Sequence, residues 1–187
     1  MAKVYVFFAD GFEEIEGITV VDILRRADQE VSMVSIGKEL DVRGSKGIKI
    51  TADVLIEEID FAQADMLVLP GGMPGTKHLG ENQLLCEELV KFAAAGKKIG
   101  AICAAPTVLG KLGLLEGKRA ACYPGAEEQL KGAAVVKERV VVDGNIITSR
   151  GAGTAIPFAL ELTASLEGEV KALQIKKNIV YGHEMNM

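Results

Sequence analysis

Short apolar runs alternate with amphipathic segments along this chain, and this alternation constrains the fold more than any other feature of the sequence. The runs at residues 3–8, 31–36, 65–69 and 98–102 have the length and composition of buried β-strands. Apolar residues at helical spacing, or a capping residue after them, indicate helices at residues 13–26, 83–95, 106–112 and 154–166. Strands that alternate with helices predict an α/β fold, with a mainly parallel sheet and helices on both of its faces.

The segments between these elements are less regular. Residues 38–57 are predicted to form short antiparallel strands, because Arg43-Gly44 and Lys46-Gly47 supply turn chemistry. Further strands are predicted at residues 135–136, 139–142 and 146–148, with a turn that includes Gly144. Since the sequence has no internal repeat, low-complexity tract or linker, residues 1–187 are predicted to form a single domain.

The composition is that of a globular protein and argues against two classes of partner. Hydrophobic residues make up 49% of the 187 residues and charged residues 25%, with a net charge of −5. There is no tryptophan and no basic stripe interleaved with aromatic residues, so we expect no nucleic-acid partner. The longest apolar stretches are far shorter than the roughly 18 residues of a membrane span, so we expect no membrane partner either.

The N-terminus and the cysteines indicate a cytoplasmic protein. The first apolar run breaks at Asp10 and leads into carboxylates rather than a signal-peptide cleavage site, so we interpret it as a strand. Cys86, Cys103 and Cys122 are odd in number and lack the spacing of a metal site, which favours free thiols. Packing is the better interpretation of Cys86, whereas Cys122 ends a short predicted strand that could bring it near a functional site.

Three loops at the carboxyl ends of predicted strands form the candidate site, at residues 10–16, 70–76 and 103–106. In the third loop, Ala101 and Ala105 stand two positions before and after Cys103, as a nucleophile on a sharp strand-to-helix turn requires. Pro106 suits the first helical turn. Unpaired N–H groups and the helix dipole are expected to lower the pKa of this solvent-reachable thiol and favour the thiolate. The alternative is a buried structural cysteine.

The Pro-Gly-Gly turn at residues 70–72 follows a buried strand. Adjacent glycines let backbone N–H groups point into a site, as an oxyanion hole requires, although the same tripeptide is often only a turn. The segment lacks the Lys-Ser/Thr of a phosphate-binding loop and the glycine spacing of a dinucleotide fingerprint. Nucleotide binding through a phosphate-binding loop and nucleotide binding through a dinucleotide-binding turn are therefore both excluded.

The first predicted helix opens with three carboxylates, Glu13, Glu14 and Glu16. Acidic residues in a first turn stabilise the helix dipole by about 0.3–1 kcal/mol each, which would explain them without a functional role. Glu13 and Glu16, however, share a helix face, so one of them could meet the thiol across the strand ends. Burial beside a thiolate would raise the pKa of that carboxyl and let it donate a hydrogen bond or a proton.

Four short motifs follow one another along the chain, EEIE, VLPGGMPG, GAICAAP and TSRGAGT. In this order and spacing they resemble the ThiJ/PfpI superfamily, and within it the branch of the parkinsonism-linked deglycase (DJ-one) and the glyoxalase III enzymes. The resemblance implies a flavodoxin-like sandwich that forms a homodimer. It implies that Cys103 is the nucleophile and redox-active thiol, and that Glu16 is hydrogen-bonded to its sulfur. The oxyanion hole would consist of the backbone amides of Gly72 and Ala104, beside Gly71.

Some positions depart from the superfamily's patterns. In its peptidase branch a histidine directly follows the cysteine, but here Ala104 does, so no imidazole takes the thiol proton and proteolysis is not expected. The two histidines are His78, after the glycine turn, and His183, in the C-terminal tail. Well-known members of the favoured branch carry a histidine where Tyr123 stands, and Tyr123 is a poor base near pH 7.

Glu16 is thus left as the obvious acid and base. Arg150 matches the family and is expected to brace the site, by pairing with Glu13.

Two functions agree with these residues. In the first, a cofactor-independent enzyme, Cys103 adds to the aldehyde of methylglyoxal or glyoxal, Glu16 moves a proton between adjacent carbons, and water releases lactate or glycolate. The same addition could act on early glycation adducts of proteins. In the second, a redox-sensing or stress-protective protein, Glu16 helps to hold an oxidised Cys103 as sulfinate. A chaperone function rests on family analogy alone.

Overall fold

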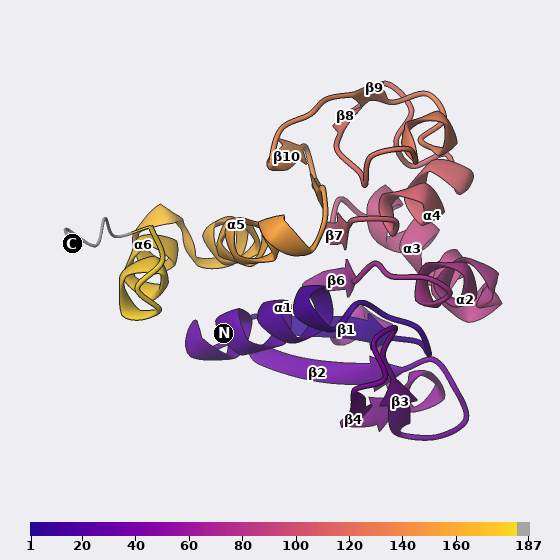
Figure 1. Cartoon of the computed structure of the whole chain (residues 1–187), viewed down its shortest axis with the longest axis horizontal. Helices are drawn as coiled ribbons and strands as arrows, with labels where there is room; N and C mark the ends of the chain where they lie inside the picture. Colours follow the sequence, from indigo (N-terminus) through magenta and orange to yellow (C-terminus); the bar gives the residue numbers. More distant parts are fainter. Residues whose placement is uncertain (183–187) are drawn as a thin grey trace.

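A seven-stranded sheet forms the centre of the computed structural model, which describes residues 1–182 (Figure 1). Its strands lie in the order β10 (Val140–Asp143), β11 (Ile146–Ser149), β7 (Lys98–Ile102), β6 (Met66–Leu69), β1 (Lys3–Phe8), β2 (Glu30–Ser35) and β5 (Val54–Leu55). Neighbouring strands are parallel except β10 and β11, which form an antiparallel pair at one edge. The mainly parallel sheet is as predicted, and its longer strands begin and end within one residue of the predicted positions.

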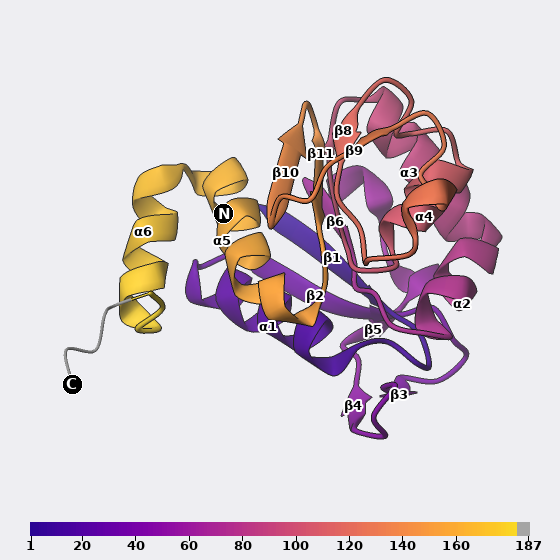
Figure 2. The ribbon, with the colours of Figure 1, turned by 45° about the horizontal axis from the view of Figure 1, so that its top comes forward.

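Helices cover both faces of the sheet (Figure 2). One face is covered by α1 (Glu14–Arg26), α5 (Ala155–Glu167) and α6 (Glu169–Asn178), and the other by α2 (Gly75–Glu81), α3 (Gln83–Ala94) and α4 (Pro106–Lys111). Side chains of β1 alternate between the two cores: Val4, Val6 and Phe8 pack with α1 and α5, whereas Tyr5 and Phe7 pack with α3. Burial on both faces explains why β1 is apolar at every position after its first residue.

The sequence pattern does not predict α2 or α6. In α2 the segment begins at Gly75, directly after the glycine turn, and contains a second glycine, Gly80, so its helix propensity is low. In α6 only Ala172 and Ile175 are buried, which leaves almost no apolar stripe to detect. Both helices are held by tertiary packing, α2 against α3 and α6 against α5.

The prediction for residues 38–57 is only partly correct. β3 (Asp41–Arg43) and β4 (Lys49–Thr51) form an antiparallel hairpin, as predicted. β5 instead pairs in parallel with β2 at the edge of the main sheet, so the antiparallel prediction is wrong for this last part. The predicted strand at residues 135–136 corresponds to β9 (Ala134–Val135), which pairs with β8 (Arg119–Ala120) outside the main sheet.

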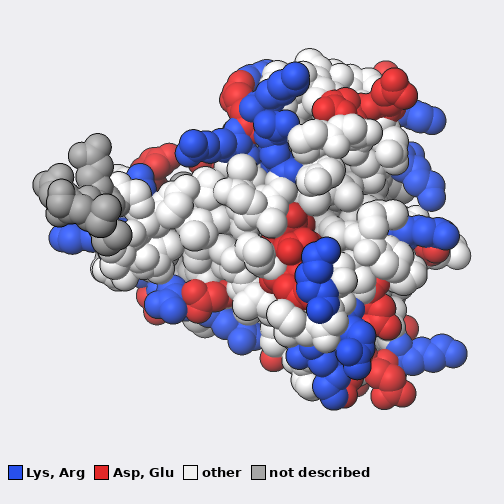
Figure 3. Space-filling view, in the orientation of Figure 1, with Lys and Arg blue, Asp and Glu red and all other residues white. Residues whose placement is uncertain are grey.

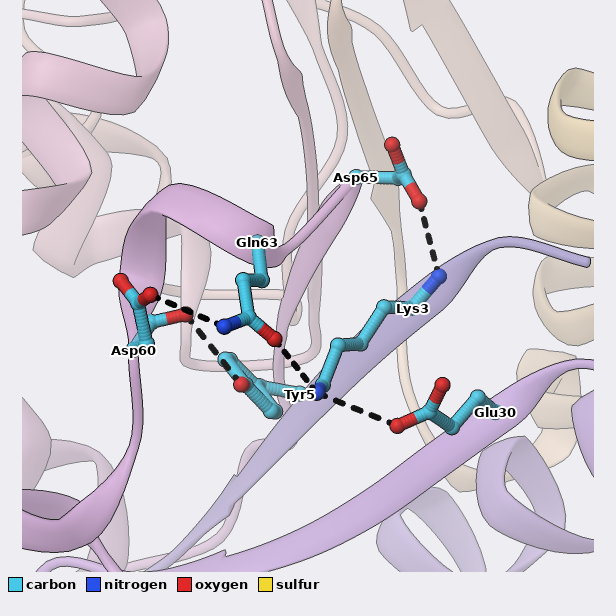
Figure 4. Close-up of polar contacts among 6 residues, drawn as sticks. All are labelled: Lys3, Tyr5, Glu30, Asp60, Gln63 and Asp65. Carbon is cyan, nitrogen blue, oxygen red and sulfur yellow. Dashed lines mark hydrogen bonds and ion pairs between the residues drawn. The ribbon is translucent and has the colours of Figure 1, made fainter.

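A polar network joins the amino ends of β1 and β2 to the turn before β6 (Figure 4). The backbone N–H of Lys3 donates to Asp65 Oδ2 at 2.8 Å. Lys3 Nζ lies 3.1 Å from Gln63 Oε1 and 3.1 Å from Glu30 Oε1. These contacts fix one end of the sheet, and the candidate site lies at the opposite end.

Within residues 1–182, no helix has both the length and the apolar character that crossing a membrane requires. The tail at residues 183–187, which includes His183, lies outside the described part of the chain.

Candidate active site

The three loops selected from the sequence meet at the carboxyl ends of β1, β6 and β7. The N–H of Glu13 donates to the Gly71 carbonyl oxygen at 2.9 Å, and a Cβ on Gly71 would lie 2.6 Å from the Cys103 Cβ. β1 has β2 on one side and β6 on the other, so the strand order reverses between β1 and β6. Open α/β sheets bind ligands at such switch points, which makes this the candidate site.

Cys103 sits on a strained turn between β7 and α4. Its φ is 66°, in the left-handed region that residues with a Cβ rarely adopt, and such strain concentrates at functional sites. Neighbouring chain segments hold the turn: the Cys103 N–H donates to the Ser149 carbonyl at 3.0 Å, and its carbonyl accepts from the Tyr123 N–H at 2.7 Å. Pro106 begins α4, as predicted. The side chain is more enclosed than predicted, since Cys103 is only 8% exposed.

Glu16 is fully buried in the first turn of α1 and faces the cysteine. Its Oε2 accepts the Gly71 N–H at 2.9 Å, and its carboxyl group forms a hydrogen bond with the Cys103 thiol. Its Oε1 has no hydrogen-bond partner among residues 1–182. The neighbouring Glu13 caps α1, because its Oε2 accepts the Glu16 N–H at 2.9 Å.

The buried acid and thiol shift each other's pKa. Burial is the largest cause that raises the pKa of Glu16, to about 7, and the charge of Glu13 adds to it. Burial, followed by the charge and the hydrogen bond of Glu16, raises the pKa of Cys103 to about 12. The predicted decrease in the thiol pKa is therefore wrong, because it considered the amide donors and the helix but neither the burial of the sulfur nor the carboxyl of Glu16 against it.

Cys103 and Glu16 thus form a coupled pair in which the position of one proton decides the charge of both groups. A proton that leaves the sulfur can pass directly to Glu16, whose pKa of about 7 allows it to hold that proton at neutral pH. Once Glu16 is neutral, it no longer repels a thiolate and can donate a hydrogen bond to it.

Two backbone amides complete the surroundings of the sulfur. The N–H groups of Gly72 and Ala104 donate to it and lower its pKa, in opposition to burial. Gly72 has a φ of 92°, and a Cβ there would lie 2.4 Å from the Glu13 nitrogen, so only glycine fits. Gly71 is equally constrained, since its Cβ would lie 2.6 Å from Glu16 Oε2. Both glycines of the turn are needed to bring α1 against the cysteine.

Comparison with known proteins agrees with this arrangement. Residues 2–165 match the DJ-1/PfpI family. The chain belongs to this family. It is 35% identical to the Glutathione-independent glyoxalase DJR-1.2 of Caenorhabditis elegans, over 88% of each chain. Protein DJ-1 homolog B of Arabidopsis thaliana is 40% identical over 94% of this chain, which spans 40% of that relative's length.

The fold is also that of solved DJ-1 proteins. The structure "Toxoplasma gondii DJ-1, oxidized" is 38% identical to this chain, with a TM-score of 0.94 and coverage of 98% of this chain and 100% of the other. The flavodoxin-like α/β fold and the family resemblance are therefore confirmed.

The sequence singles out Arg150, Tyr123 and His78 as residues that could support the site in this DJ-1/PfpI chain. Arg150 forms no ion pair with Glu13 in residues 1–182, so the predicted pair is wrong; the Glu13 carboxylate is used as the cap of α1. Tyr123 is 55% exposed at the mouth of a cleft beside the site. His78 approaches the first loop through Nδ1, which lies 2.9 Å from the Asp10 carbonyl oxygen.

Gly151 is a site residue that the sequence did not single out, although it lies within the fourth motif. A Cβ at this position would lie 4.0 Å from the unpartnered Oε1 of Glu16 and 3.5 Å from the Tyr123 ring. Thr154 Oγ1 accepts the Gly151 N–H at 3.1 Å and so holds the loop in place. Only a three-dimensional contact identifies this position.

The other two cysteines do not join the site. Cys122 packs in the core on the opposite face of the sheet from Cys103, and burial raises its pKa to about 11. Cys86 is half-buried, with its thiol directed at the Leu79 and Gly80 carbonyls, as expected of a packing residue. Among residues 1–182, no group of His, Cys, Asp or Glu side chains could hold a metal ion.

Proposed function

We propose that the chain is a cysteine-dependent glyoxalase III or deglycase-like enzyme that acts on methylglyoxal, glyoxal or early glycation adducts. The observation that carries the proposal is the coupled pair of Cys103 and fully buried Glu16, with two amide donors at the sulfur. A nucleophile, a proton acceptor and oxyanion donors within one enclosed turn are the parts that carbonyl addition requires. The similarity to a glyoxalase of Caenorhabditis elegans supports the same reaction.

The first step is addition of the thiol to the aldehyde. Glu16 takes the proton from Cys103 while the sulfur forms a bond to the aldehyde carbon, and the carbonyl oxygen becomes the oxyanion. The N–H groups of Gly72 and Ala104 stabilise this charge. Glu16 then returns the proton to the oxygen, which gives a hemithioacetal and leaves Glu16 as a carboxylate.

The second step transfers hydrogen between adjacent carbons. Glu16 removes the proton from the former aldehyde carbon, and the neighbouring carbonyl carbon is protonated in turn, so the first carbon is oxidised as the second is reduced. The product is a thioester of a 2-hydroxy acid. Water hydrolyses it to lactate, or to glycolate from glyoxal, and restores the thiol. No outside oxidant or reductant is needed, because the substrate holds both oxidation levels.

The test is methylglyoxal turnover by the wild type and two variants, with lactate as the readout. Cys103→Ala removes the nucleophile and is expected to abolish lactate formation. Glu16→Gln keeps the shape but cannot accept a proton, so kcat/KM is expected to fall by about 10²–10⁴-fold. Normal lactate production by Cys103→Ala would refute the proposal.

The alternative function is redox sensing or stress protection, and the same contacts favour it. Gly72 and Ala104 amides and a neutral Glu16 would stabilise the negative oxygens of a sulfinate. One structural neighbour is described as oxidized. Mass spectrometry after mild peroxide is expected to find two added oxygens on Cys103 and none on Cys86 or Cys122. Equal oxidation of all three thiols would argue against this function.

We also propose that the protein is a cytoplasmic homodimer and not a peptidase. Ala104 supplies no imidazole next to the nucleophile, which a cysteine peptidase requires. Ile15 and Ile18 are 56% and 39% exposed on one side of α1, and Ile48 is 58% exposed on the neighbouring hairpin. Figure 3 shows a broad area without charged side chains over α5, which packs against α1. Exposed apolar surface of this kind favours association of two copies.

A further inference from the structure

A cleft of about 670 Å³ lies beside the cysteine, between α2, α4 and the segment at residues 123–131. Clefts of roughly 300–1,000 Å³ hold ligands of drug size, so this one is much larger than a three-carbon dicarbonyl needs. Methylglyoxal and glyoxal, the two small dicarbonyls proposed above, would leave most of it empty.

Three separate chain segments line the inner end of the cleft and also contact Cys103 or flank a residue that does. Ala104, which lines the cleft, donates its N–H to Cys103 Sγ. Met73 lines it next to Gly72, the second amide donor. Tyr123 lines it and donates its backbone N–H to the Cys103 carbonyl. A substrate carbon bonded to the sulfur is therefore next to the inner end of this cleft.

The deeper lining is small and mainly apolar, with the hydroxyls of Thr76 and Thr107 as its polar groups, whereas the charged side chains that line the cleft are exposed at its rim. Val108 is 3% exposed at the inner wall, and Ala104 and Ala126 are half-buried.

At the rim, Lys77 lies 3.9 Å from Glu81, so these two charges offset each other. Lys111 Nζ donates to the Gly80 carbonyl oxygen at 3.3 Å. Glu128 and Lys131, of opposite charge, also line the cleft and are exposed. An uncharged apolar group is the occupant that this arrangement fits.

We propose that this cleft is the subsite for the apolar substituent of 2-oxoaldehydes longer than methylglyoxal, and that it makes them the better substrates. The inference rests on the proposed glyoxalase function and specifies its substrate class. Burial of one methylene favours binding by a factor of about four, so kcat/KM is expected to rise about fourfold per carbon until the cleft is filled.

Gly80 offers a way to close the cleft from within. It lines the cleft on α2, and a Cβ there would lie 3.4 Å from Val108 Cγ2, an ordinary contact. Its φ is not in the left-handed region, so side chains are compatible with its backbone. Gly80→Ala would add one methyl group, and Gly80→Leu would extend a side chain into the space. Val170→Leu on α6, where Val170 is 82% exposed, is the matched control.

The experiment compares kcat/KM for methylglyoxal and 2-oxohexanal, which differ by three methylenes. The wild type and Val170→Leu are expected to favour 2-oxohexanal by about 60-fold, the product of three fourfold steps. Gly80→Ala is expected to reduce this ratio, and Gly80→Leu to reduce it below about fivefold. A wild-type ratio near one, or an unchanged ratio in a folded Gly80→Leu variant, would overturn the proposal.

Binding of 2-hexanone, followed through amide NMR shifts, separates this inference from the proposed function. Amide shifts at Ala104, Thr107 and Ala126 that are lost in Gly80→Leu would support the subsite. If these shifts occur but neither aldehyde is turned over, the proposed function fails and the subsite stands. Absence of such shifts at saturating ketone overturns the subsite, whatever the wild type does with methylglyoxal.

Discussion

Glu16 combines complete burial with fewer hydrogen-bond donors than a carboxylate can use. A carboxylate has about four acceptor sites, but this one receives only the Gly71 N–H, at Oε2, and the Cys103 thiol, and Oε1 has no partner among residues 1–182. The charged form is therefore poorly compensated, which explains why burial dominates its raised pKa. The same imbalance that makes Glu16 useful as a proton carrier should lower the stability of the fold.

Replacing Glu16 with glutamine is expected to stabilise the protein above neutral pH. The pKa of Glu16 rises from 4.5 to about 7 on folding. As pH increases, the unfolded chain therefore loses this proton at a lower pH than the folded chain does. The free energy of unfolding falls as pH increases between these two values. From pH 5 to pH 8 this loss amounts to about 2–3 kcal/mol, and the glutamine variant avoids it.

Urea unfolding of both proteins at pH 5 and pH 8 measures this difference. The exposed substitution Glu39→Gln is the control and should follow the wild type. If the wild type and Glu16→Gln lose the same stability between the two pH values, the carboxyl is not held neutral by the fold.

At the scale of elements, Glu14 joins α1 to the β3–β4 hairpin. It is 7% exposed, and its carboxylate accepts hydrogen bonds from the Lys46 N–H at 2.7 Å, the Ile48 N–H at 3.4 Å and the Ser45 hydroxyl at 3.2 Å. Gly44 allows this approach, since a Cβ there would lie 2.4 Å from Glu14 Cδ. One buried carboxylate thus organises the hairpin turn against the first loop of the site.

Glu14→Gln is expected to destabilise the hairpin in a pH-dependent way. Burial raises the pKa of Glu14, but the backbone N–H donors of Glu14, Lys46 and Ile48 outweigh it, so the pKa is lowered overall. Such a group stabilises the fold above its unfolded pKa of 4.5, and this stabilisation is lost as pH falls through the folded value. The expected cost of the variant at pH 7 is about 1.5–3 kcal/mol, as for hydrogen bonds to a charged group.

Hydrogen exchange at the Lys46 and Ile48 amides measures the effect locally. Both amides should exchange faster in Glu14→Gln at pH 7, and the difference in stability from the wild type should narrow below about pH 4. An equal difference at pH 7 and pH 3 would show that the charge of Glu14 is not the cause.

The elements show where sequence patterns are sufficient. β1, β7 and α1 have strong periodicity or continuous apolar character, and all three are predicted almost to the residue. α2 is missed because its two glycines give it a low helix propensity, and α6 because it has almost no apolar stripe; both depend on packing against neighbouring helices. In the site, local motifs locate Cys103 and Glu16. The raised pKa of the thiol follows first from its burial and then from its contact with Glu16, a residue 87 positions away in the sequence. A local sequence pattern shows neither cause.

At the scale of the whole molecule, one side of α1 exposes apolar side chains to solvent. Val20, Val21 and Leu24 face the core, whereas Ile15 and Ile18 face outward. Their neighbour on the hairpin, Ile48, is held near the start of α1 through its N–H bond to Glu14. Solvent exposure of three isoleucines around one helix end is costly in a monomer and is relieved by a twofold contact.

Ile15→Glu is therefore expected to dissociate the proposed homodimer without unfolding the chain. In a twofold interface the substitution buries two uncompensated carboxylates, so the dimer dissociation constant should rise by about a hundredfold or more. Sedimentation equilibrium measures the constant, and circular dichroism checks the fold. Val170→Glu is the matched control, because Val170 is 82% exposed on α6, away from the start of α1. A wild type that sediments as a monomer at every concentration, or a Val170→Glu variant that dissociates as readily as Ile15→Glu, would contradict an interface at this end of α1.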